Sequence, residues 1–259
     1  MRNAFIDELV TAAEINENIV LIVGDLGYSV VEPFANKFPK RFFNAGVAEQ
    51  NMMGLAAGLA SEGFHVFVYS IANFPTFRCA EQIRNDVDYH KLPVTVVAVG
   101  GGLAYGNLGY SHHAVQDYAL MRVMPNMLIA APGDPMEVRA CMRYLINNPQ
   151  PSYLRLGKSG EPCIHTEVPL VSPGRWLHIR EGEKGGKTYL TTGAPLELVS
   201  KLVTTKPDLK DWSLCSMPLW SMKVKAMQVQ QIENFSTIVT VEDHLMDGGF
   251  GSWLLESAI

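Results

Sequence analysis

The hydrophobic positions of this chain follow two alternating periods as far as Leu156. Short continuous apolar runs are typical of parallel strands buried on both faces, and the segments between them carry apolar residues at helical spacing. Strands that alternate with helices indicate βαβ units, so we expect an α/β fold with a mostly parallel sheet. The expected strands are Asn18–Val23, Phe64–Ser70, Pro93–Val99, Met127–Ala131 and Ser152–Leu156, and the expected helices are Asn3–Asn16, Val30–Phe38, a helix from Glu49, Phe74–His90, Ala114–Met124 and Pro135–Asn147.

The segment from Gly157 to Gly174 interrupts this alternation. It contains Pro, Ser and charged residues without periodicity, which is typical of a linker between domains. We therefore expect a first domain over residues 1–157, a linker over 158–174 and a second, smaller α/β domain over 175–259. The chain stops within an apolar segment without a cap or breaker, so we expect the second domain to be incomplete. Its expected strands are Lys187–Thr192, Ser213–Met217 and Ser236–Val241, and its expected helices are Ala194–Thr204 and Lys223–Asn234.

Composition excludes several classes of protein. The 259 residues are 47% hydrophobic and 18% charged, as in a globular protein with a large core, and a net charge of −5 without a Lys/Arg block argues against nucleic-acid binding. No apolar run reaches the ~18 residues of a membrane helix, and the N-terminus has no signal-peptide core. The four cysteines are scattered without a CxxC pair, which indicates reduced thiols of a cytoplasmic protein and no metal site.

The stretch Asn44–Ala60 places a carboxylate, Glu49, at the mouth of a helix built from small residues. Small side chains allow another backbone or a flat ring to approach closely. Because few polar residues follow Glu49, we expect its carboxyl group to be desolvated and to hold its proton unusually well. Such a carboxyl can give a proton to a ring nitrogen and take it back. A Glu that only complements the helix dipole explains the same residue, so the stretch alone leaves both interpretations open.

Further motifs in a fixed order make the sequence resemble a known family. The segment Gly46–Gln50 resembles the pyrimidine-binding half of thiamine-diphosphate enzymes of the transketolase group, and the likeness covers essentially the whole chain. It implies a parallel-sheet pyrimidine-binding domain followed by a transketolase C-terminal domain. The other stretches that carry the likeness are Val23–Leu26, Glu81–Ile83, Lys91–Val94, Ser111–His112, Met121–Met127, Thr240–His244 and Gly248–Ser252.

The resemblance implies that the chain binds thiamine diphosphate. The cofactor then supplies the electron sink, and the protein sets the tautomer and the geometry of the cofactor. Glu49 then holds the proton on N1′ of the aminopyrimidine ring. Phe74 and Phe77 fall where the family places the aromatic platform for that ring, although an ordinary core position explains Phe77 nearly as well. His112 resembles the histidine that faces the hydroxyl groups of the donor sugar. His113 beside it is also a substrate-binding candidate, although its role is open.

Three further residues have both a functional and an ordinary interpretation. Asp25 follows a strand and is either a hydrogen-bonding carboxylate of the cofactor site or a simple turn residue. Lys158 stands where the family has an Arg that contacts the substrate phosphate, but a solvated linker lysine explains it almost as well. Arg155, on the preceding strand, is a similar substrate-binding candidate. None of the site residues is expected to bind a metal ion.

Some family residues are replaced here. Gly100 and Gly101 occupy the place of a His-Asp pair that contacts the sugar in transketolase, and Leu108 stands where transketolase has an Asp that contacts a donor hydroxyl. The sugar contacts of the family therefore do not carry over to this chain, and the donor is left open.

The chain also lacks the Gly-Asp-Gly and distant Asn of the family's magnesium and diphosphate signature. A magnesium ion that carries a diphosphate needs oxygen ligands in near-octahedral geometry. We therefore expect a split enzyme in which this chain is the C-terminal subunit. A second, N-terminal subunit would bind Mg²⁺ and the diphosphate, and two copies of each chain would form an α2β2 assembly that acts on sugars.

Three alternatives stay open at this point. The chain resembles, in addition, 1-deoxyxylulose-5-phosphate synthase and the β-subunit of 2-oxo acid dehydrogenases, although the segment Arg122–Asn126 favours transketolase. A non-catalytic partner subunit would keep the fold without the chemistry, but the presence of Glu49 and His112 argues against it. A general α/β binding module leaves the ordered motifs unexplained.

Overall fold

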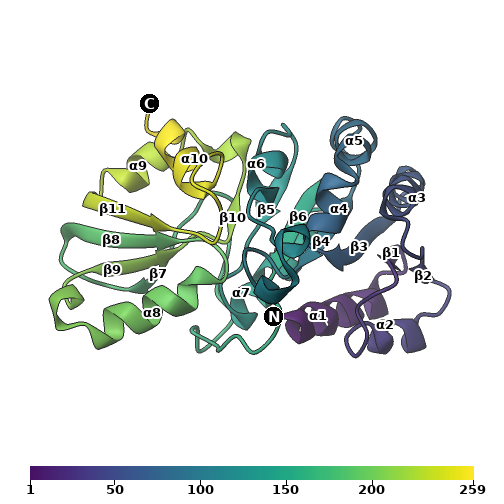
Figure 1. The fold of residues 1–259 in the computed structure, drawn as a ribbon, viewed down its shortest axis with the longest axis horizontal. Coiled ribbons are helices and arrows are strands. Elements are labelled where there is room, and N and C mark those ends of the chain that lie inside the picture. The colour runs from purple at the N-terminus through teal and green to yellow at the C-terminus, as the bar shows by residue number, and fades with distance from the viewer.

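The computed structural model describes residues 1–259 and contains a seven-stranded and a four-stranded sheet (Figure 1). In the large sheet the strands have the order β10-β5-β6-β4-β3-β1-β2, and every neighbouring pair is parallel except β10 and β5. The predicted α/β class with a mainly parallel sheet is therefore confirmed. The strands of this sheet are β1 (Ile19–Val23), β2 (Phe42–Asn44), β3 (His65–Ile71), β4 (Val94–Val99), β5 (Leu128–Ala130), β6 (Ser152–Leu156) and β10 (Leu219–Trp220).

Helices cover both faces of this sheet, as buried parallel strands require. On one face lie α1 (Arg2–Ile15), α2 (Glu32–Lys37) and α7 (Pro135–Asn147), and on the other lie α3 (Glu49–Ser61), α4 (Asn73–Phe77), α5 (Ala80–Gln82) and α6 (Asp117–Arg122) (Figure 1). Side chains of a strand alternate between the faces. In β4, Val97 and Val99 join the core beneath α1, whereas Val96 and Ala98 join the core beneath α3.

The one long helix predicted over Phe74–His90 is broken in the structure. Helix α4 ends at Phe77, α5 starts at Ala80, and a π-helix follows over Ile83–Asp88. At the break the Cys79 N–H bonds to the Thr76 carbonyl, three residues back, instead of continuing the α-helical ladder. The turn between α4 and α5 carries Arg78.

The C-terminal part of the chain forms the smaller sheet, of order β11-β8-β9-β7, in which only β7 is antiparallel to its neighbour. Strand β10 leaves this unit and adds to the edge of the large sheet, so the two units share a sheet as well as a core. None of the helices combines the length and the apolar character that crossing a bilayer requires. The remaining elements are β7 (Leu177–Arg180), β8 (Gly185–Thr191), β9 (Ser213–Ser216), β11 (Phe235–Val241), α8 (Pro195–Thr205), α9 (Gln228–Ile232) and α10 (Phe250–Ser257).

A buried acidic cluster attaches the 158–174 segment to the start of α7. The Asp134 side chain accepts a hydrogen bond from the Glu137 N–H at 2.7 Å, which caps the helix, and accepts two more from the N–H groups of Ile164 and His165. Glu137 is fully buried and accepts from the Gly133 N–H at 2.7 Å through Oε2, whereas its Oε1 has no hydrogen-bond partner. One carboxylate therefore lies in the core with only half of its acceptors satisfied.

Replacing Glu137 by Gln is expected to flatten the pH dependence of stability. Burial raises the pKa of Glu137 from 4.5 to about 7, so its contribution to stability is complete below about pH 4.5 and is lost as the pH rises through 7. Burial lowers the pKa of His165, but its contacts with Asp134 and Glu137 outweigh that effect and raise the pKa. The contribution of His165 to stability is therefore also lost as the pH rises. At pH 8 we expect the E137Q protein to be more stable than wild type by about 2 kcal/mol, a melting shift of about 5 °C.

Thermal unfolding between pH 5 and pH 8 measures this effect. The exposed Glu167, in the same segment as His165, provides the matched control E167Q, which should melt like wild type at each pH. An E137Q protein that melts below wild type at pH 8 would show that the carboxylate, and not only its size, is needed in this cluster.

Candidate functional site

Glu49 is the first residue of α3 and lies at the edge of the sheet where the parallel strands end. Only 4% of its surface is exposed, so the burial predicted from the sequence is confirmed. The structure adds a cation that the sequence did not indicate: the Arg78 guanidinium donates from Nη1 to both Glu49 oxygens at 2.9 Å. Glu49 is thus poorly hydrated as expected, but it has a charged partner, because Arg78 lies opposite it.

A short polar network shapes the loop that leads into α3. The Asn44 side chain accepts hydrogen bonds from the N–H groups of Asp25 and Gly46 at 3.1 and 2.9 Å, and donates to the Asp25 carboxylate at 3.0 Å. Asp25 and Gly46 have φ angles of 53° and 70°, a region that Gly adopts easily and Asp only in special turns. Asp25 thus joins the ends of β1 and β2 and is both a turn residue and a hydrogen-bonding carboxylate. Its contact with a cofactor stays a prediction.

Two aromatic side chains of α4 line a cavity of about 470 Å³ beside Glu49. Phe74 and Phe77 lie on its wall together with Arg78, and Phe77 is 49% exposed, so it is not a core residue. A second cavity of about 480 Å³ is lined by Glu49 and again by Arg78. The guanidinium carbon lies 4.3 Å from the centre of the Phe74 ring, so Arg78 forms the boundary between the two cavities.

The loop that carries His112 closes one side of the first cavity. The His112 ring meets the Phe74 ring edge-on, with centres 5.3 Å apart, and its Nδ1 lies 3.0 Å from the Ser111 hydroxyl. His113 instead faces the loop, where its Nε2 lies 3.0 Å from the Gly106 carbonyl. The Asn73 amide donates to the His113 carbonyl at 2.7 Å and holds the loop against α4. The structure therefore brings Glu49, Phe74 and His112 to one edge, and gives His113 a contact within the loop.

The residues at this edge fit an aminopyrimidine ring. Such a ring needs a carboxylate at one nitrogen, an aromatic face to stack on and further polar atoms at its amino group. Glu49 and Phe74 supply the first two, and the Oδ1 atom of Asn73, which lines the cavity, is buried without a hydrogen-bond partner. No group of three or more His, Cys, Asp or Glu side chains is arranged for a metal ion.

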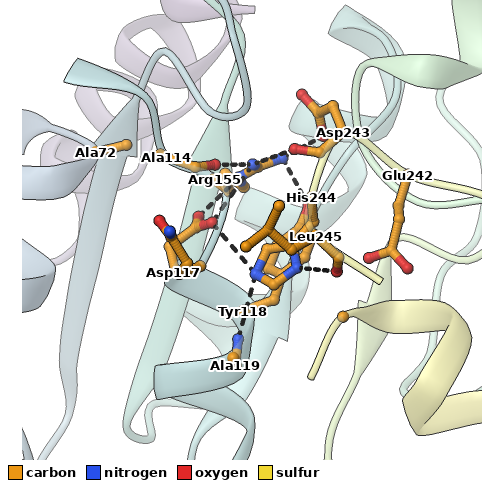
Figure 2. A network of polar contacts seen from close by, with 12 residues as sticks. Ala72, Ala114, Asp117, Tyr118, Ala119, Arg155, Glu242, Asp243, His244 and Leu245 are labelled. Carbon is orange, nitrogen blue, oxygen red and sulfur yellow. Dashed lines mark hydrogen bonds and ion pairs between the residues drawn. The ribbon is translucent and has the colours of Figure 1, made fainter. Parts of the chain in front are cut away.

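Arg155 lies elsewhere than the sequence analysis expected. It is 4% exposed and its nitrogens are all engaged within the chain: Nε donates to Asp117 at 2.8 Å, and Nη2 to the Ala114 carbonyl at 2.6 Å (Figure 2). Nη1 donates to the Asp243 carboxylate and, at 3.1 Å, to the Tyr118 hydroxyl. No donor is left for a substrate phosphate, because the strand β6 directs this side chain into the junction of the two units. Arg155 is therefore a structural residue in this geometry.

The C-terminal motif Thr240–His244 supplies the other half of this junction. Beside Asp243, the His244 ring stacks on Tyr118 with centres 5.2 Å apart (Figure 2). Glu242 accepts hydrogen bonds from two N–H groups at the start of α10. Asp117, on α6, also accepts from the Tyr153 hydroxyl at 2.5 Å. The sequence signal for this junction was the motif itself, but the motif did not show that it faces Arg155.

Close packing explains the two glycines that replace the sugar-contacting pair of the family. A Cβ atom at Gly100 would overlap the Tyr105 ring, and one at Gly101 would overlap the Arg155 guanidinium. Gly100 also has a φ angle of +78°, where a side chain is strained. Any larger residue at these positions would displace the packed side chains.

Lys158 and Leu108 lie in and around the same loop region. Lys158 is exposed, and its ammonium lies 5.0 Å from the centre of the Tyr105 ring, whose edge faces His112. Leu108 is 51% exposed. The position of Lys158 leaves it free to contact an anion, and its role stays a prediction.

Comparison with known proteins identifies what this arrangement is similar to. Residues 1–161 match the family model described as transketolase, pyrimidine binding domain. An apulose-4-phosphate transketolase subunit of Phocaeicola vulgatus is 32% identical over 99% of this chain and 82% of its own length. A solved structure described as split gene transketolase, inactive beta4 tetramer, is 34% identical, with a TM-score of 0.86 over 99% of this chain and 83% of that one. The 1-deoxy-D-xylulose-5-phosphate synthase of Aquifex aeolicus is 34% identical over 96% of this chain but only 39% of its own length.

Proposed function

The chain belongs to the transketolase family, and from that membership we propose that it is the C-terminal subunit of a split transketolase. The complete enzyme transfers a two-carbon ketol unit from a ketose donor to an aldose acceptor. The observation that carries this proposal is the position of Glu49, buried at the start of α3 beside an aromatic wall and the His112 loop. When bound, thiamine diphosphate supplies the nucleophilic carbon and the electron sink for that unit.

The side chains of this edge have separate tasks in the proposed enzyme. Glu49 holds and returns a proton at N1′ of the aminopyrimidine, as a buried carboxylate within hydrogen-bond reach can. Phe74 and Phe77, both on α4, provide the surface on which the aminopyrimidine ring stacks. Helix α4 also shields that face of the aminopyrimidine from solvent. His112 faces the hydroxyl groups of the donor, and the loop residues around it exclude water. Lys158 contacts the phosphate of the sugar, and His113 keeps the loop in place.

A partner subunit is the second part of the proposal. It would carry the diphosphate and Mg²⁺, and the exposed face of α3 supports a close approach by another chain. A Cβ at Gly54 or Gly58 would meet no atom within 4 Å, and Leu55 beside them is 41% exposed. The relative described as an inactive tetramer of β chains is consistent with a subunit that needs another. We propose a cytoplasmic heterotetramer with two copies of each chain. Within this chain we propose two domains, residues 1–157 and 175–259.

The partner's role is tested by calorimetric titration with thiamine diphosphate and Mg²⁺. This chain mixed with the diphosphate-binding subunit is expected to bind the cofactor and to gain ketol transfer, because only the pair presents both halves of the site. This chain alone is expected to bind at least 100-fold more weakly. Tight, Mg²⁺-dependent binding by the single chain would refute the split arrangement.

The similarity to 1-deoxyxylulose-5-phosphate synthase supports a second candidate reaction. The glycines at 100 and 101 remove the sugar contacts of transketolase, and a 2-oxo acid donor needs fewer of them. The two reactions differ in their products. A ketose donor yields a shortened aldose, whereas pyruvate releases CO2. Apulose 4-phosphate should be among the ketose donors tested, because a relative is named for it. Release of CO2 without ketol transfer would favour the second candidate.

A further inference from the structure

The contact between Arg78 and Glu49 is unusual for a pair at the mouth of a site. One nitrogen, Nη1, serves both carboxylate oxygens at 2.9 Å, so the contact lacks the two parallel bonds of a bidentate pair. Glu49 is 4% exposed, whereas the Arg78 side chain is 49% exposed. The buried partner therefore depends on a cation that is itself half in solvent and has two cavities, of about 470 and 480 Å³, into which it can move.

Arg78 makes the same two contacts that the site offers to an aminopyrimidine. Its guanidinium is planar and cationic, donates an N–H to the Glu49 carboxylate, and lies with its central carbon 4.3 Å from the centre of the Phe74 ring. A protonated aminopyrimidine is also planar and cationic, donates an N–H to a carboxylate and stacks on an aromatic face. The two groups compete for one place, because the guanidinium already lies over the Phe74 ring and along the Glu49 carboxylate, where the aminopyrimidine would stack and bond.

We propose that Arg78 is a positioning residue that holds Glu49 in the free chain and gives way when an aminopyrimidine enters. This inference rests on the proposed function. In the free chain the pair compensates a carboxylate that would otherwise be buried alone. On binding, Arg78 leaves the carboxylate and the ring takes its place on Glu49 and Phe74. The free energy needed to release Arg78 from Glu49 lowers the affinity of the wild-type subunit for the cofactor. The subunit therefore responds weakly to ligands that cannot both bond to the carboxylate and stack on the ring.

The R78M variant in the two-subunit enzyme tests this inference. Without the guanidinium, Glu49 has no partner to release, so calorimetry is expected to show thiamine diphosphate with Mg²⁺ binding about tenfold more tightly than to wild type. Its melting temperature without cofactor should lie below that of wild type, and the difference should shrink when cofactor is saturating. R78Q, which keeps an amide NH₂ donor without the charge, should give values between those of wild type and R78M. R84M, on the exposed face of the next helical turn, should behave like wild type in both measurements.

Two results would overturn the inference. One is cofactor binding by R78M that is unchanged or weaker, which would make Arg78 a structural residue or a direct ligand. The other is a melting difference that stays the same with and without cofactor. The E49Q variant separates this failure from that of the proposed function: full ketol transfer by E49Q refutes the function, whereas loss of transfer in E49Q with unaltered binding in R78M refutes only the role of Arg78.

Discussion

Replacing Glu49 by Gln is expected to lower the ketol-transfer rate of the assembled enzyme by about 10²–10⁴-fold, the range for loss of a positioned acid–base group. The amide has nearly the same shape and still fits at the start of α3, but it cannot give a proton to N1′ and take it back. Initial rates of the two-subunit enzyme, at saturating cofactor and sugar, measure the effect. Because Gln keeps a polar group opposite Arg78, the variant is expected to fold and to assemble.

Glu62 provides the matched control for this substitution. It follows the last residue of the same helix, is exposed, and makes no side-chain contact with the cavities, so E62Q should have the wild-type rate. An E49Q enzyme within about twofold of the wild-type rate would indicate a non-catalytic partner subunit that keeps the fold. That result would also remove the main reason for placing the cofactor at this edge.

The R155M variant is expected to lose about 3–5 kcal/mol of stability, the cost of removing one partner of a buried ion pair. Without the guanidinium, the fully buried carboxylate of Asp117 and the carboxylate of Asp243 lose their cation. The pKa of Arg155 is raised well above its usual value, because the attraction of these two carboxylates outweighs the burial that opposes it. For a chain of this length the loss lowers the melting temperature by about 10 °C or more.

Thermal unfolding of three companions makes this prediction specific. R175M removes an exposed arginine in the segment that enters β7 and should melt like wild type. R155K keeps the charge but not the planar fork and should fall between wild type and R155M. The double variant R155M/D117N should recover part of the loss, since it removes a carboxylate that would be left unpaired. An R155M protein with the same melting temperature as wild type would mean that the two units are held together by apolar packing alone.

The elements that the sequence predicted best are those with strong local signals. Helix α7 and strand β6 have the same bounds in the structure as in the prediction. In α7 a capping Asp134 and a following Pro135 define the start. In β6 all five residues are buried, the polar Ser152 and Arg155 included. The two-residue strand β10 was not predicted, because so short a segment carries no periodicity and its antiparallel pairing with β5 is a long-range contact.

At the site, residue types were easier to predict than their partners. The sequence indicated a buried Glu49, an aromatic Phe74 and a loop His112, since each belongs to a local motif. It did not indicate Arg78, which is 29 residues from Glu49 in the sequence and lies in the turn where the predicted long helix breaks. It misplaced Arg155 for a related reason: a cation on a strand shows a charge, but not the two carboxylates that converge on it from α6 and the C-terminal segment.

The most direct measurement is a crystal structure of the two-subunit assembly with thiamine diphosphate and Mg²⁺ bound. A Glu49 oxygen should lie about 2.6–3.2 Å from N1′ of the aminopyrimidine. The ring should stack on Phe74, with Arg78 turned away from the carboxylate. A cofactor held entirely by other residues, with Glu49 still bonded to Arg78, would contradict the assignment of this edge as the pyrimidine site.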